Sequence, residues 1–199
     1  MTTNRSTELG SETGENPFLG RKLETLDDIP REIADRRLLS EFGPWIAPEK
    51  SEIVRNTSDV LEKPEEFAES AKRAGLQDPE GVLGYSTKLE DPAHVLKSDV
   101  GMEIATLIHE DLHRFTSPET LKEIYADPEL RQLYEGVTER FTEQAAQGLH
   151  GFQPGEIYPK QVEAAGQIAS EVGDQALRDW YFRHEVAEDL QKALDRLGE

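Results

Sequence analysis

The segment His109-Glu110-Asp111-Leu112-His113 constrains this chain more than any other part of the sequence. It lies in the run 100–115, whose apolar residues recur at spacings of three and four, as in a helix with one core-facing side. On such a helix, residues four apart lie on one face, about one turn from each other. Two imidazoles placed this way can bind one Zn²⁺, and the Glu between them can take a proton from a water that the metal activates. The segment therefore predicts His109 and His113 as zinc ligands and Glu110 as the general base.

A second predicted helix offers the acidic groups that such a site needs. Asp127-Pro128 is typical of a helix start, and the helix ends near Gly148. Glu135 and Glu139 lie four apart on it and can face the same partner. A catalytic zinc site with two His needs a third protein ligand and an open position for water. One carboxylate would be that ligand, and the other would accept the free N–H of a ligating His. The plainer alternative is two partly exposed His on an acidic helix, each hydrogen-bonded to a neighbour.

These two segments together resemble the gluzincin metallopeptidases, the clan that includes thermolysin and the zinc aminopeptidases. The segment Ile108 to Thr142 is also similar to small bacterial metallopeptidase domains with an IHE-x-LH and EG-x-TE pattern, some of which are found in toxins. Carried over by position, the gluzincin resemblance implies His109, His113 and Glu135 as ligands of one Zn²⁺ per chain, Glu110 as the general base, and Glu139 as the carboxylate behind a ligand.

Two positions depart from the gluzincin pattern. Tyr134 stands where Asn often precedes the ligand Glu, and Glu139 stands where an Asp is usual. The gap between His113 and Glu135 is also slightly longer than in those families. Glu139 therefore remains an alternative to Glu135 as the direct ligand.

The composition limits the partners that we expect. The chain has 199 residues, enough for one domain, and a net charge of −19. Such a surface repels phosphate backbones, so we expect no nucleic-acid partner. We expect a peptide or protein substrate, and the acidic surface favours basic substrates. There is no Cys for a disulfide or a thiolate metal site. We expect a monomer.

The ends of the chain carry predictions about location. Residues 1–20 are polar and without periodicity, which predicts a disordered tail, and residues 21–199 are expected to form a single zincin-like metallopeptidase domain. No apolar run is long enough to span a bilayer, so we expect no membrane partner. The N-terminus lacks the apolar region of a secretory signal. We expect a cytoplasmic protein in the producing cell, or one exported without a cleavable signal peptide.

The fold class expected is α+β and mostly α-helical. Strand signals at 82–87 and 93–96 predict a small antiparallel sheet or hairpin before the metal-binding helix. Helical patterns are found at 26–39, interrupted by Pro30, at 64–75, and in three segments after Tyr158. The stretch 42–48 is expected to be an extended connection. In the zincin resemblance, an edge strand beside the cleft pairs with the substrate backbone.

A peptidase also needs a donor for the oxyanion, often a Tyr or His outside the metal helices. Tyr158 is the first candidate, at a junction between a loop and a helix, and His150 and His184 are further candidates. The function expected is a zinc-dependent peptidase, in the form of a narrow-specificity bacterial effector or toxin. An aminopeptidase is less favoured, because no acidic amine-binding motif stands near the hairpin. The alternative is a non-catalytic acidic interaction module with a structural metal or none.

Overall fold

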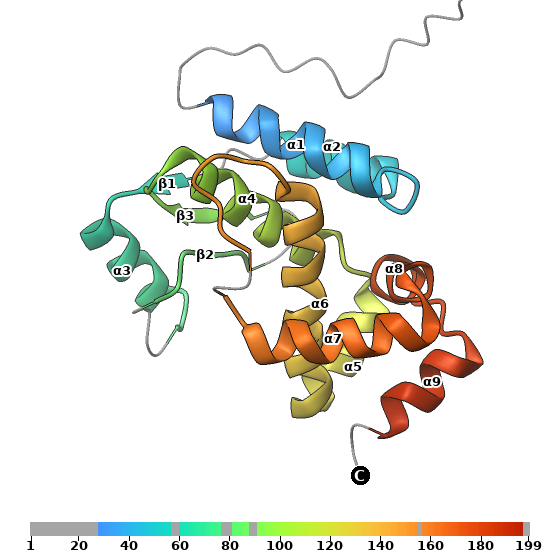
Figure 1. Ribbon diagram of the computed structural model, residues 1–199. Helices are drawn as coiled ribbons and strands as arrows, with labels where there is room; N and C mark the ends of the chain where they lie inside the picture. The colour runs from blue at the N-terminus through green and yellow to red at the C-terminus, as the bar shows by residue number, and fades with distance from the viewer. Residues whose placement is uncertain (1–27, 57–59, 77–80, 88–90, 155–156, 197–199) are drawn as a thin grey trace, which may run out of the picture.

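The computed structural model describes residues 28–56, 60–76, 81–87, 91–154 and 157–196, and within these ranges the chain is mostly helical (Figure 1). The prediction of a disordered tail at 1–20 lies outside the described residues. The elements, in chain order, are α1 (Asp28–Phe42), α2 (Pro48–Asn56), β1 (Val60–Glu62), α3 (Pro64–Arg73), β2 (Gly84–Tyr85), β3 (His94–Leu96), α4 (Val100–Phe115), α5 (Pro118–Ala126), α6 (Pro128–Ala146), α7 (Pro159–Val172), α8 (Asp174–Arg183) and α9 (Glu188–Asp195).

Helices α4 and α6 form the centre of the arrangement. Helix α4 packs between α1 and α6, and α7 crosses α6 on another side. Figure 1 shows the strands and α3 at one end of the molecule, with α8 and α9 at the other. The apolar stripe expected on α4 is buried, which confirms the helix and its core-facing side; it comprises Ile104, Leu107, Ile108, Leu112 and Phe115.

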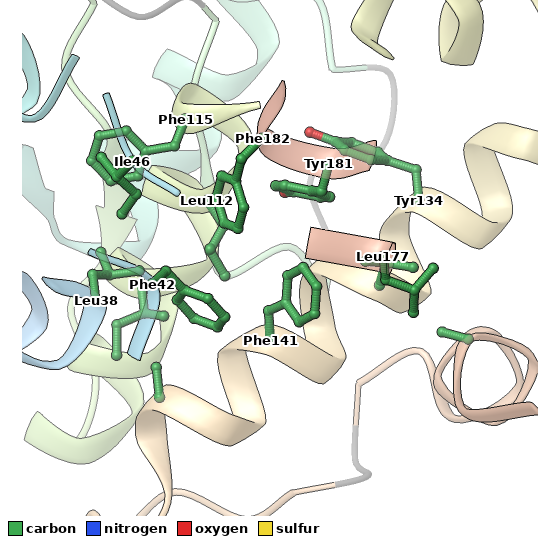
Figure 2. Packing of buried hydrophobic residues seen from close by; sticks show 14 of the residues in the cluster. Leu38, Phe42, Ile46, Leu112, Phe115, Tyr134, Phe141, Leu177, Tyr181 and Phe182 are labelled. Atoms are coloured by element: carbon green, nitrogen blue, oxygen red, sulfur yellow. The ribbon is translucent and has the colours of Figure 1, made fainter. Parts of the chain in front are cut away.

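An aromatic cluster joins the first helix to the last third of the chain (Figure 2). The ring centroids of Phe42 in α1 and Phe141 in α6 are 5.1 Å apart, and Phe182 in α8 lies 5.6 Å from Phe42. Tyr181 contacts Phe141 edge-on at 5.5 Å and stacks on Tyr134 at 5.2 Å. Truncation of a fully buried Phe to Ala typically costs about 3–5 kcal/mol. This cluster therefore holds α1, α6 and α8 in fixed relative positions.

The sheet has three strands in the order β1-β3-β2 and precedes α4. Strand β2 pairs antiparallel with β3, with Tyr85 opposite His94, which confirms the predicted hairpin. Strand β1 pairs with β3 in parallel and was not predicted. Its three residues are too few to show an alternating pattern. The sheet order leaves β2 at an edge, next to α4.

Several helix predictions are confirmed, whereas the interruption expected at Pro30 and the extended connection expected at 42–48 are wrong. Helices α3, α6, α7, α8 and α9 lie where the patterns indicated. Pro30 does not interrupt α1, because it occupies the first turn, where no backbone N–H is needed. The stretch 42–48 is a turn and not an extended connection, since the amides of Trp45 and Ile46 bond to the carbonyl of Phe42. Helices α2 and α5 were not predicted. Across the described ranges, the structure contains no helix with the length and apolarity that a bilayer crossing needs.

The closest approach of α7 to α6 occurs at Gly136, the residue after Glu135. A Cβ atom added at Gly136 would lie 2.1 Å from the carbonyl oxygen of Gln161 in α7. That separation is far inside van der Waals contact, and backbone cannot move away as a side-chain tip can. The glycine therefore lets α7 lie directly against the turn of α6 that presents Glu135.

Gly136→Ala should destabilise the protein, although alanine is favoured over glycine by about 1 kcal/mol in an exposed helix. We expect a loss of about 1–3 kcal/mol in the free energy of unfolding, as for other overpacked sites. The measurement is chemical denaturation followed by circular dichroism. Gly166→Ala in α7 is the matched control, because its nearest contact would be Arg140 at 3.9 Å. Equal stability of the two variants would show that the close approach does not limit the packing.

Candidate metal centre

Three of the residues singled out in the sequence meet at one point between α4 and α6. The Nε2 atoms of His109 and His113 are 3.1 Å apart. The Oε2 atom of Glu135 lies 3.8 Å from the first nitrogen and 3.5 Å from the second. Tetrahedral zinc with bonds of about 2.0–2.2 Å needs donor atoms about 3.3–3.6 Å apart. The three residues could therefore hold one such ion with only small adjustments, and two imidazoles with a carboxylate suit zinc chemically.

The other ring nitrogen of each His is held by a group on α6. His109 Nδ1 lies 3.0 Å from Oε2 of Glu139 and 3.4 Å from Oγ1 of Thr142. His113 Nδ1 lies 2.8 Å from the hydroxyl of Tyr134. Such partners orient a ligating imidazole and select its tautomer. Glu139 thus contacts the far side of His109, whereas Glu135 faces the point shared by both His.

Hydrogen-bond direction around Tyr134 determines the tautomer of His113. The Thr116 hydroxyl donates to the carbonyl of Leu112 at 3.1 Å, and it lies 2.9 Å from the Tyr134 hydroxyl. Because a hydroxyl has one proton, Thr116 must accept from Tyr134. Tyr134 must then accept from the Nδ1–H of His113. His113 therefore presents the lone pair of Nε2 toward His109 and Glu135, as a metal ligand must.

Tyr134 is the site residue that sequence reasoning missed, since it was noted only as a departure from Asn. It is buried, at 4 % exposure, and stacks on Tyr181. The available signal was its position directly before Glu135 on a predicted helix. A tyrosine reaches farther than an asparagine, and here it reaches the ring of His113.

Glu110 lies on α4 beside the edge strand β2. Its carboxylate is largely buried, and its Oε2 accepts a hydrogen bond from the Ser86 hydroxyl at 3.1 Å. Gly84 makes this approach possible, because an added Cβ atom would lie 2.5 Å from Thr106 and 3.0 Å from the Cγ atom of Glu110. The strand therefore runs directly alongside the candidate base.

Asp111, at a variable position of the motif, anchors the metal helix from behind. Its side chain is fully buried and forms ion pairs with Arg31 of α1 and, at 3.1 Å, with Arg114 of α4. Removing one partner of a buried pair typically costs about 3–5 kcal/mol, because the remaining charge is left uncompensated. The face of α4 opposite the two His is thus held to α1.

Ionisation couples the imidazoles to the carboxylates. Burial alone lowers the pKa of His109, but hydrogen bonds to Glu135 and Glu139 and the nearby charge of Glu110 raise it to about 10. Burial raises the pKa of Glu135, and the charges and hydrogen bonds of His113 and His109 outweigh it and hold this pKa well below its usual value. Without metal, a proton on His109 thus balances part of the acidic charge.

Two cavities of about 410 and 310 Å³ open beside the His pair. Both are lined by His109, Glu110 and Tyr158. The Tyr158 ring stacks on His109 with 6.2 Å between centroids, and its backbone is left-handed at φ 52°. Such a conformation is strained for a residue other than glycine, and residues strained in this way cluster at active sites and ligand-binding sites. Burial, together with the charges of Glu135 and Glu110, raises the pKa of Tyr158 to about 12, so its hydroxyl stays protonated at neutral pH.

The remaining His residues lie away from this point. His150 is exposed, and its backbone packs against Gly101 at the start of α4. His184 follows α8 and contacts Thr120 and Glu123. Neither lines the two cavities, so among the three oxyanion candidates only Tyr158 does. His94 bonds to Glu62 at 3.2 Å and stacks on Tyr85.

Tyr134→Phe should weaken zinc binding by about 10–100-fold, because His113 loses the oxygen that orients it. The measurement is competition for zinc against a chromophoric chelator. Tyr125→Phe is the control, since Tyr125 is 73 % exposed and contacts neither His. Unchanged zinc affinity in Tyr134→Phe would show that packing alone orients the ring.

The metal-free protein should lose stability as the pH rises from about 6.5 to about 10. The pKa of His109 is 6.5 in the unfolded reference and about 10 in the folded protein, so the folded state binds more protons in this window. Its contribution is complete below the lower value and is lost as pH passes the upper one. Chemical denaturation with a chelator present should therefore show a stability difference between wild type and His109→Gln that shrinks with rising pH. A difference for His109→Gln that stays constant over this range would contradict the assignment.

Comparison with models of known protein families, with curated proteins and with solved structures finds no match for this chain. The donor distances and hydrogen bonds of this chain itself are therefore what support a metal centre. The gluzincin resemblance remains one of motif and spacing.

Proposed function

We propose that this chain is a zinc-dependent peptidase of the gluzincin type, with one zinc ion held by His109, His113 and Glu135. The observation that supports it most is the convergence of these donor atoms within 4.8 Å of one another, beside Glu110 and two open cavities. A structural zinc site is closed by four protein ligands. In the described part of the chain, the group that could hold a metal has three ligands, which leaves a position for water.

The chain's own side chains can supply the proton transfers of amide hydrolysis. A zinc ion held by His109, His113 and Glu135 would supply Lewis-acid polarisation of the peptide carbonyl and would acidify a water. Glu110 takes the proton from the attacking water and passes it to the leaving amine. The protonated hydroxyl of Tyr158 donates a hydrogen bond to the carbonyl oxygen as that oxygen gains charge. Glu139 and Tyr134 hold the two imidazoles in orientation throughout.

Strand β2 is the proposed binding edge for an extended substrate. One side of β2 pairs with β3, and the sheet order leaves its other side as an edge. Gly84, Tyr85 and Ser86 line the larger cavity together with Glu110. A peptide added along this edge would receive main-chain hydrogen bonds, with its side chains pointing alternately into the cavities. Such pockets would support the narrow specificity expected of a bacterial effector or toxin.

Glu110→Gln should retain zinc and lose peptide hydrolysis by at least about 10²–10⁴-fold, because Gln cannot accept the proton. The measurement pairs metal analysis of the purified protein with cleavage of a library of unstructured peptides. Glu163→Gln on α7 is the control, since it makes the same chemical change at an exposed position outside the cavities.

The outcomes separate the peptidase from the alternatives. Turnover that survives Glu110→Gln would remove Glu110 as the base. Equimolar zinc in a wild-type protein that cleaves no peptide of the library would favour the non-catalytic interaction module. A protein that binds no zinc, or in which His113→Ala leaves zinc occupancy unchanged, would end the metallopeptidase proposal.

A further inference from the structure

The two cavities beside the candidate metal centre differ in charge. The larger one is lined by the basic residues Lys50, Arg114 and Arg131, and its acidic lining residues are Glu110 and Glu135 of the site itself. The smaller one has no Lys or Arg among its described lining residues. In a chain with 41 acidic and 22 basic residues, the larger cavity thus has more basic than acidic lining residues, the reverse of the whole chain.

Lys50 presents a fixed ammonium group at this cavity. Its Nζ atom donates to the carbonyl oxygens of Phe115 and Thr116 at 3.0 and 2.9 Å. An ammonium has three donors, so one remains for another acceptor. Burial lowers the pKa of Lys50, and the charges of Glu119 and Glu49 partly offset this. Within the described ranges, neither carboxylate forms an ion pair with it.

Arg131 provides the second charge, one turn before Glu135 on α6. Its guanidinium carbon lies 6.0 Å from the ring centroid of Tyr125, and its charge offsets a small part of the rise in the pKa of Tyr158. The side chain is exposed and forms no ion pair with any described residue. Arg114 differs, because its guanidinium is fully buried against Asp111. The cations free to meet a ligand are therefore Lys50 and Arg131.

Apolar side chains also line the larger cavity. Leu76, Val82, Leu121 and Ile124 line the same cavity. Apolar walls exclude water and strengthen a charge pair formed beside them. A guanidinium and an ammonium bind carboxylates through charge-assisted hydrogen bonds.

We propose that Lys50 and Arg131 in the larger cavity bind a carboxylate of the substrate, so that the preferred substrate is a peptide with an acidic residue or a free C-terminus near the bond to be cut. This inference rests on the proposed peptidase function. It also differs from the preference for basic substrates that the net charge suggested, because Lys50 and Arg131 line the larger cavity of a chain that is acidic as a whole.

The test measures binding and cleavage separately. Labelled peptides from a library, with Glu, Gln or Lys fixed at each position in turn, are bound to the full-length zinc-loaded Glu110→Gln protein and followed by fluorescence anisotropy. Each series is made with a free and with an amidated C-terminus, which distinguishes a side-chain carboxylate from a terminal one. The same peptides are given to the wild-type protein to measure cleavage.

One carboxylate series should bind about tenfold more tightly than its neutral counterpart. Arg131→Gln and Lys50→Met, each introduced into the Glu110→Gln protein, should reduce that ratio toward one. Lys122→Gln on α5 is the control, because it removes one positive charge from an exposed position outside the cavity. Raising the salt from about 50 to about 500 mM should also reduce the ratio, since screening weakens an accessible charge pair.

The remaining outcomes contradict either the carboxylate site or the peptidase function. Equal binding of the acidic and neutral series, tighter binding of the Lys series, or no peptide binding at all would overturn the carboxylate site. A preference for the carboxylate series that survives Arg131→Gln would also overturn the carboxylate site. This variant is the cleaner test, because Lys50→Met also removes the hydrogen bonds of Lys50 to the end of α4. Carboxylate-selective binding with no cleavage by the wild type would instead overturn the peptidase function and leave the binding site standing.

Discussion

Two imidazoles on α4 face two carboxylates on α6, and each of these four side chains has its position only because the two helices pack against each other. Phe141 of α6 lies in the same core as Leu112 of α4, the residue before His113. Gly136 lets α7 pack closely against α6, and Asp111 ties α4 to α1. Each of the two helices is therefore restrained by a further helix, and the donor atoms between them stay near one another.

A set of threonines sets the direction of hydrogen bonds around this core. Thr116, Thr138 and Thr142 each donate to a carbonyl four residues earlier. Each hydroxyl oxygen is thereby left to accept, respectively from Tyr134, Tyr181 and His109. Because these hydroxyl protons are assigned, the Nδ1–H of each His donates to a group on α6, and its Nε2 faces the point between His109, His113 and Glu135. Buried polar groups that are fully satisfied in this way favour a single arrangement.

Net charge and the individual charged groups of the larger cavity act on a ligand over different distances. The net charge of −19 describes the whole chain and governs encounter with other molecules over long range. At the cavity wall, individual groups such as Lys50 and Arg131 decide which ligand charge is favoured, because short-range pairs beside apolar surface are screened less. Composition alone therefore says little about the charge preference of a binding site.

Much of the site was predictable from local patterns, because a helical repeat fixes which residues share a face. Spacing alone placed His109 with His113, and Glu135 with Glu139, and the strand signals located the hairpin of β2 and β3. Strand β1, the hydrogen bond of Tyr134 to His113, and the cations of the larger cavity could not be predicted, since each depends on residues far apart in sequence. The sequence by itself determined most of the helices, α2 and α5 excepted, and the faces that α4 and α6 present. Only the tertiary structure decided that Glu135 faces the His pair while Glu139 lies behind His109, because the rotation of α6 against α4 is set by the core packing on both sides.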